Sequence, residues 1–189
     1  GIHSMAELNQ DNAELSVFTF KEGLLSPVAH DLRLDVGRWS ARVDKTGPGA
    51  VALTAAFDAS SLTVAGVMRD GRLVKDVLGP RDTDKIARNI REEVLSSTRH
   101  PSISWRGQGA IVAGTPRVDG ELTLVGKTKR LSARVRKEGV DPLWVIETTV
   151  HQPDFGIKPY SAMLGALKIK PDVVVSLRVA DRLIASLIA

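Results

Sequence analysis

Apolar and polar residues alternate along several stretches of this chain, and a period of two is typical of β-strands with one buried face. The clearest stretch covers residues 31–43, where Gly37 interrupts the alternation. A glycine inside a long strand pattern indicates a bulge or a sharp bend, as the corner of a curled sheet requires. The buried face of this stretch is predicted to carry Leu32, Leu34, Val36, Trp39, Ala41 and Val43.

The same alternation recurs along the rest of the chain. It covers residues 15–20, 51–64, 102–113, 118–125, 131–135, 145–150 and 173–179. Helices do not alternate with these stretches, which argues against a parallel α/β architecture. The pattern therefore predicts an all-β fold of about eight antiparallel strands that close on one another. Such a closed sheet either fills its own interior or holds a ligand there.

One segment has helical periodicity. It begins near Asp82 or Thr83, both N-cap residue types, and ends near Ser97, ahead of Pro101. We expect this amphipathic helix and the charged connection at residues 66–82 to cover one end of the barrel as a gate. Its apolar stripe consists of Ile86, Ile90 and Val94.

The two ends of the chain differ in character. Residues 1–4 precede Met5 and are interpreted as a cloning remnant, so one domain is expected over residues 5–189. Residues 180–189 form an apolar tail in which Leu183 and Leu187 have helical spacing. We expect the tail to pack on the barrel or across a dimer interface, with a membrane-surface anchor as the alternative.

Composition narrows the classes of function. Hydrophobic residues make up 43% of the 189 positions, and there is no cysteine for a disulfide or a thiolate metal site. The net charge of +4 is dispersed and aromatic residues amount to only 4%, so we expect no nucleic-acid partner. No apolar run reaches the roughly 18 residues of a membrane span. Because residues 5–11 are polar and acidic, we expect a cytoplasmic protein, or a periplasmic or secreted one if a signal peptide preceded this sequence.

The sequence contains no nucleophile elbow, phosphate-binding glycine loop or dinucleotide fingerprint. His30 beside Asp31, and His151 near Asp154, are candidates for acid–base or metal chemistry. Adjacent strand residues point to opposite faces, and metal-ligand spacing is lacking, so His30 is interpreted as a structural residue at a strand entrance. We therefore predict no catalytic residue, no metal site, no cofactor and no enzymatic activity.

Basic residues gather in two parts of the second half of the chain. They form either a solvated surface or a basic rim that meets a phosphate or pyrophosphate head at a barrel mouth. The residues concerned are Lys127, Lys129, Arg130, Lys158, Lys168 and Lys170.

Several phrases in order along the chain resemble the YceI-like, polyisoprenoid-binding family. They are FTF at residues 18–20, VAHDL at 28–32 leading to GRW at 37–39, STRHPSI at 97–103, VDGELTLVGKTK at 118–129 and DFGI at 154–157. The resemblance implies a lipocalin-like eight-stranded antiparallel barrel in a bacterial protein that is often a homodimer. It also implies an apolar tunnel for an isoprenoid chain, such as a polyprenyl phosphate or an isoprenoid quinone.

The expected function is thus the carriage or sequestration of an isoprenoid or other long-chain lipid, with peripheral membrane contact. Two alternatives are a filled barrel that acts as a protein-interaction module and an enzyme on a lipid that uses His30 and Asp31, or His151. Small inward residues such as Gly120 and Ala133 favour a hollow interior. The predicted ligand-binding residues are Val17, Leu32, Leu34, Val36, Leu53, Phe57, Trp105, Leu122, Leu124, Ile146, Val175 and Leu177.

Overall fold

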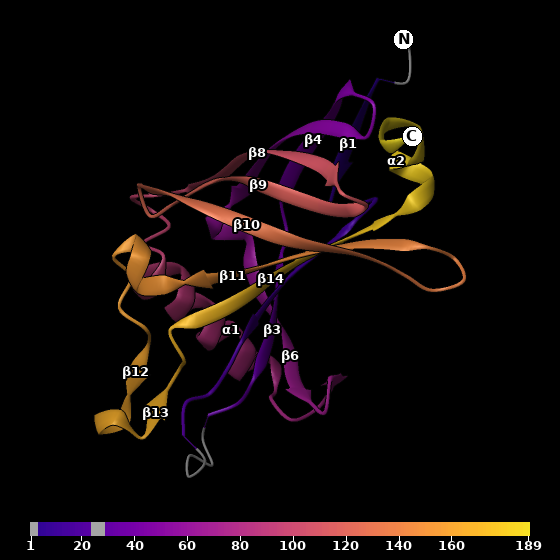
Figure 1. Cartoon of the computed structure of the whole chain (residues 1–189). Coiled ribbons are helices and arrows are strands. Elements are labelled where there is room, and N and C mark those ends of the chain that lie inside the picture. The colour runs from indigo at the N-terminus through magenta and orange to yellow at the C-terminus, as the bar shows by residue number, and fades with distance from the viewer. Residues whose placement is uncertain (1–3, 24–28) are drawn as a thin grey trace.

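The structure is a computed structural model that describes residues 4–23 and 29–189. Most of the chain forms one antiparallel sheet that curls around an apolar interior (Figure 1). The sheet has twelve strands, in the spatial order β1 (Met5–Asn9), β4 (Trp39–Gly47), β5 (Ala50–Asp58), β8 (Ser102–Val112), β9 (Thr115–Leu124), β10 (Lys127–Glu138), β11 (Leu143–His151), β14 (Asp172–Ala180), β2 (Glu14–Thr19), β3 (Leu32–Val36), β6 (Leu62–Arg69) and β7 (Arg72–Val74).

Helices and a small second sheet cover the ends of this curled sheet. Helix α1 spans Pro80–Asn89 and continues as a π-helical turn at Ile90–Val94, and helix α2 spans Asp181–Ile188. The second sheet pairs β12 (Ser161–Ala162) with β13 (Leu167–Lys168). Short 3-10 turns lie at Ala59–Ser61, Gln152–Phe155 and Met163–Gly165.

The prediction of a closed eight-stranded barrel with one helix is wrong in its details. In the described part of the chain the sheet has twelve strands, and its edges β1 and β7 do not pair with each other. Two helices are present, because the apolar tail at residues 180–189 forms α2. The all-β class and the antiparallel pairing are as predicted.

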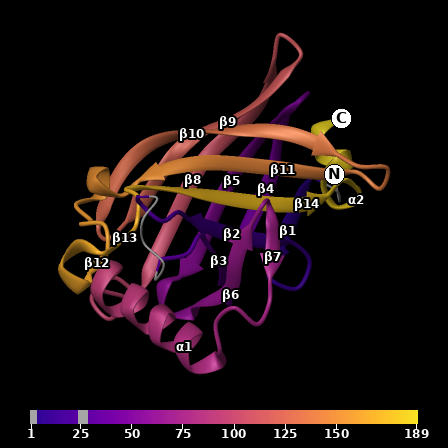
Figure 2. The same cartoon turned by 90° about the horizontal axis from the view of Figure 1, so that it is seen from below.

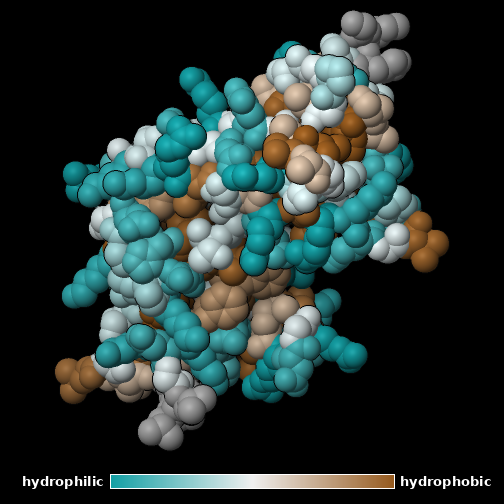
Figure 3. All heavy atoms as spheres, in the orientation of Figure 1, coloured by the Kyte–Doolittle hydropathy of each residue, from teal (hydrophilic) through white to brown (hydrophobic). Residues whose placement is uncertain are grey.

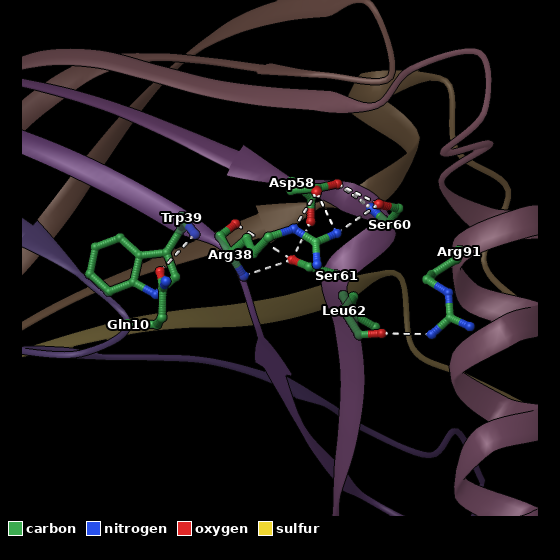
Figure 4. A network of polar contacts seen from close by, with 8 residues as sticks. All are labelled: Gln10, Arg38, Trp39, Asp58, Ser60, Ser61, Leu62 and Arg91. Carbon is green, nitrogen blue, oxygen red and sulfur yellow. Dashed lines mark hydrogen bonds and ion pairs between the residues drawn. The ribbon is translucent and has the colours of Figure 1, made fainter.

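The chain turns a corner between β3 and β4, next to the corner between β5 and β6, and β3 pairs with β6 while β4 pairs with β5. Gly37 N donates to Ser61 O at 2.9 Å, and Arg38 N donates to Ser61 Oγ at 2.9 Å. A Cβ on Gly37 would lie 3.0 Å from Ser61 O, so this close approach favours glycine. The bend predicted at Gly37 is therefore present, and Figure 4 shows the polar contacts that surround it.

Two further predictions about the elements need correction. Residues 66–82 are not a simple connection, because they contain the end of β6, all of β7 and the start of α1. The helix begins at Pro80 rather than near Asp82, with Gly79 as its N-cap. Strand β1 was not predicted, since its sequence MAELN offers little alternation.

Buried side chains form two clusters at opposite ends of the interior. One cluster packs α2 against the sheet through Ile184 and Leu187, next to Trp39. The other surrounds Leu34 and Phe155 and contacts α1. In Figures 1 and 2, α2 lies at the end opposite β12 and β13. The tail thus closes one end of the interior, which confirms that it packs on the sheet.

Within residues 4–23 and 29–189, no helix has both the length and the apolar character to cross a membrane. The predicted cloning remnant at residues 1–4 lies almost wholly outside the described residues, as does Val28 of the VAHDL phrase.

Candidate lipid cavity

A cavity of about 500 Å³ lies inside the curled sheet, at the end away from α2. Its walls come from the inward faces of the strands, from α1 and from the β12–β13 region. The size falls within the range of ordinary small-molecule sites. This end of the interior is therefore hollow, which argues against the alternative of a filled barrel.

The pairing register of neighbouring strands brings apolar side chains together in one wall of the cavity. In the β14–β2 ladder Val175 lies opposite Val17, and in the β2–β3 ladder Val17 lies opposite Leu34. These three side chains form a row across adjacent strands, and all three line the cavity. Leu32 lies two residues from Leu34 on the same face, and it also lines the cavity.

Helix α1 lies along one side of the curled sheet (Figure 2), and residues of the helix and of its π-helical turn line the cavity. Ile86, Ile90 and Val94 line the cavity and pack against the buried cluster around Leu34. The predicted apolar stripe is therefore buried on the sheet, as the period of the helix requires. Arg91 donates a hydrogen bond to Leu62 O at 2.8 Å and ties the turn to β6.

The segment around β12 and β13 forms a further wall and is tied to the end of β2. Lys170 N donates to Phe20 O at 2.8 Å, and Glu22 N donates to Lys168 O at 2.9 Å. Through these bonds Leu167 and Ile169 reach the cavity. This wall did not follow from the sequence, because residues 155–171 show neither helical nor strand periodicity.

Few polar side chains reach the cavity, and several of them come from α1 and the segment that precedes β12. Asn89 Nδ2 donates to Tyr160 Oη at 3.4 Å, and Asp82 and Lys85 line the cavity on the same helix. Gln152 is buried, and its Nε2 donates to Lys170 O at 3.2 Å. An apolar wall with a few polar groups suits an amphiphile with a long apolar part.

Eight of the twelve predicted ligand-binding residues line the cavity. They are Val17, Leu32, Leu34, Val36, Phe57, Leu122, Leu124 and Val175. These positions combine an inward direction with a place near the hollow end of the sheet.

The other four predicted residues lie away from the cavity. Leu53 and Leu177 pack against the cluster at the α2 end, and Ile146 lies opposite Leu177 in the β11–β14 ladder. Trp105 lies over the strand pair β8–β9, where a Cβ on Gly120 would come 2.6 Å from its Cζ2 atom. Gly120 therefore makes room for an aromatic ring rather than for a cavity.

Residues that the sequence did not single out for binding also line the cavity. Tyr160 is the one tyrosine of the chain, and Met163 follows it in the segment between the last two long strands. His30 also lies in the wall. The single tyrosine of the chain, in a glycine- and lysine-containing segment, was the available signal for Tyr160.

The candidates for acid–base or metal chemistry are dispersed. His151 Nδ1 contacts Asp172 Oδ1, its neighbour in the β11–β14 ladder, and not the nearby Asp154. Asp31 Oδ1 accepts a hydrogen bond from Lys21 N at 2.8 Å. Among the described residues, no group of three or more histidine and carboxylate side chains is placed to hold a metal ion.

Parts of the two basic groups predicted from the sequence lie close together, but none of their six residues lines the cavity. Lys127 reaches the turn after β11, where its Nζ would lie 2.8 Å from a Cβ on Gly156. Lys158, Lys168 and Lys170 are exposed on the segment that forms the cavity wall.

The protein thus belongs to the class of β-proteins in which a curled antiparallel sheet encloses a cavity. Here a helix covers the hollow end. The chain belongs to the YceI-like family, whose domain model matches residues 8–180. The resemblance carried by the sequence phrases is thereby confirmed. Among curated proteins, none matches the chain.

Solved structures share this architecture. BcnA from Burkholderia cenocepacia is 13% identical, with 88% of this chain and 94% of that chain covered at a TM-score of 0.56. The YceI protein of Campylobacter jejuni is 13% identical, with coverages of 85% and 88% and a TM-score of 0.56. A polyisoprenoid-binding domain from Saccharophagus degradans is 12% identical, with coverages of 94% and 98% and a TM-score of 0.48. At these identities the first two show a shared fold.

Proposed function

We propose that this protein binds an amphiphilic isoprenoid lipid, such as a polyprenyl phosphate or an isoprenoid quinone, and carries or sequesters it. The observation that carries the proposal is the apolar cavity of about 500 Å³ inside the curled sheet. Membership of the YceI-like family supports it, because the family resemblance implies a polyisoprenoid ligand.

The energetics favour a long apolar tail in this cavity. Each 100 Å² of apolar tail surface removed from water contributes about 2.5 kcal/mol. Association costs about 4–15 kcal/mol in lost translational and rotational freedom, so a tail must bury several hundred Å² to bind well. The row of Val175, Val17 and Leu34, faced by Ile86 and Ile90 from α1, supplies such a surface.

The polar groups of the wall favour one orientation of the lipid. Lys85 and Asn89 lie on α1 and Tyr160 lies just before β12, all at the end of the interior away from α2. A head group placed there keeps access to water and hydrogen-bond donors, while the tail points toward the end that α2 closes. A phosphate head would gain from Lys85, and a quinone oxygen would accept from Asn89 or Tyr160.

Organic extraction of the purified protein, followed by mass spectrometry, tests this proposal. We expect a lipid with an isoprenoid tail in stoichiometric amount, or uptake of added polyprenyl phosphate when the expression host supplies none. Extracts that contain only straight-chain lipids, together with no uptake of the added isoprenoid, would contradict the proposal.

A further inference from the structure

The turn between β12 and β13 carries two neighbouring apolar side chains that are exposed to solvent. Met163 is 63% exposed and Leu164 is 109% exposed. In Figure 3 a hydrophobic protrusion marks this corner of the molecule, over the β12–β13 region. A single exposed apolar residue is ordinary, but two adjacent large ones at the tip of a protrusion indicate a contact surface.

The backbone of the turn that carries the apolar tip is unusual. Met163 has φ 55°, Leu164 has φ 56° and Gly165 has φ 89°, so three successive residues are left-handed. Residues other than glycine avoid this region because Cβ approaches the carbonyl oxygen. Strained backbone of this kind concentrates at functional sites.

The apolar tip is continuous with the cavity. Met163 is exposed to solvent and also lines the cavity, and Leu167 and Ile169, which follow it, belong to the same wall. An apolar surface therefore runs from the tip into the cavity. Another fully exposed apolar side chain, Val140, lies between β10 and β11 and is not part of the cavity wall.

The segment that carries the tip is basic. Lys158, Lys168 and Lys170 are exposed, and residues 155–171 contain no aspartate or glutamate. The neighbouring Lys21 and Glu22, which bond to this segment, add no net charge. A protruding apolar tip on a segment with exposed lysines and no acidic residue has the character of a surface that inserts between the head groups of anionic lipids.

We infer that the β12–β13 tip docks on an anionic lipid membrane, with Met163 and Leu164 inserted and Lys158 and Lys168 against the head groups. Docking in this way places the cavity against the bilayer, so that a lipid tail can pass between them along apolar surface. The passage of the tail depends on the proposed function, whereas the docking does not.

Co-sedimentation with vesicles free of isoprenoid tests membrane docking separately from isoprenoid binding. The wild-type protein is expected to bind vesicles that contain phosphatidylglycerol, to bind pure phosphatidylcholine vesicles weakly, and to release at high salt. Met163→Asp with Leu164→Asp should lower the bound fraction at least about tenfold, and Lys158→Glu with Lys168→Glu should do the same. The melting temperature should change little in both pairs, which shows that the fold is intact.

Matched controls exist for both pairs of substitutions. Val140→Asp places one carboxylate at an apolar position as exposed as Leu164, and Arg106→Glu with Arg134→Glu reverses two exposed charges on β8 and β10. Both controls should sediment with the vesicles like the wild type. The inference is overturned if the wild-type protein does not bind the anionic vesicles, or if the controls lose binding equally. It is also overturned if ultracentrifugation shows a dimer that the Met163 and Leu164 pair abolishes, since a second copy would then cover the tip.

Discussion

Arg38 and Asp58 join two bends of the chain at one corner of the sheet. One bend lies between β3 and β4, and the other lies between β5 and β6. The Arg38 guanidinium donates to Asp58 Oδ2 from Nε at 2.9 Å and from Nη2 at 2.7 Å. Asp58 N donates to Arg38 O at 3.0 Å, and the Ser60 hydroxyl donates to Asp58 Oδ1 at 2.6 Å. These bonds hold the pKa of Asp58 below its usual range, with the Ser60 hydroxyl as the largest cause and Arg38 as the next.

The lowered pKa of Asp58 predicts how the free energy of unfolding depends on pH. A carboxyl whose pKa is lowered by folding contributes stability that is fully present above its ordinary pKa of about 3.9 and is lost as the pH falls through the folded value. Asp58→Asn should therefore destabilise the protein at neutral pH, and its difference from wild type should shrink below about pH 4. Ser60→Ala should reduce the same pH dependence. Urea midpoints measured across this range check it, and a pH-independent difference would contradict it.

Gly120 is predicted to be indispensable for packing. A Cβ there would meet the Trp105 ring and the Arg106 carbonyl oxygen, so either the ring or the β8–β9 pairing must shift. Gly120→Ala should destabilise by about 1–3 kcal/mol. Gly47→Ala is the matched control, because nothing lies within 4 Å of its Cβ position, and it should change stability little. Equal denaturation midpoints for the two variants would show that Trp105 is free to move.

The lid role of α1 is tested at Ile90. Ile90→Asp places a carboxylate in the apolar contact with the strands, which costs several kcal/mol when the charge is unpaired. Hydrogen exchange should then quicken in α1 and its π-helical turn, while β9 to β11 stay protected. Arg88→Asp, on the exposed face of the same helix, should leave the exchange rates of α1 and its π-helical turn close to those of the wild type. Wild-type protection of α1 in Ile90→Asp would show that the helix does not depend on this contact.

The packing at the end of the interior opposite the cavity depends on α2. Leu187 is 1% exposed in the cluster with Trp39, and Trp144 Nε1 donates to Asp181 Oδ1 at 2.7 Å at the start of the helix. Leu187→Ala should cost about 2–5 kcal/mol, whereas Ser186→Ala on the exposed face should be nearly neutral. Thermal or denaturant unfolding measures both. A small effect at Leu187 would mean that the tail does not close this end.

The alternation of apolar residues predicted the strands from β8 to β11 and β14 well, because each has one inward and one outward face over nine or more residues. It did not predict that the sheet stays open. The corner between β3 and β4 is held by hydrogen bonds from Gly37 N and Arg38 N to Ser61, which are long-range contacts with no periodic signature. Strand β1 is too short for a pattern to emerge.

For the cavity, the sequence indicated which residues of each strand point inward. It did not indicate which of these inward residues lie at the cavity and which lie at the end that α2 fills. Val17 and Leu177 both point inward, yet Val17 lines the cavity and Leu177 packs at the α2 end. That position depends on register between strands and on which end a helix fills. The wall from Tyr160 to Ile169 was not predicted for a related reason, since hydrogen bonds to Phe20 and Glu22 hold it there rather than a regular element.

Equilibrium binding of polyprenyl phosphate and isoprenoid quinone to Val17→Trp tests the central claim most directly. Val17 lies in the middle of the row Val175, Val17 and Leu34, so an indole ring there would occupy the space of the tail. We expect saturable binding to the wild-type protein and to Val140→Trp, and loss of binding in Val17→Trp with the fold retained by circular dichroism. Equal binding to all three proteins would place the lipid outside the cavity and contradict the account.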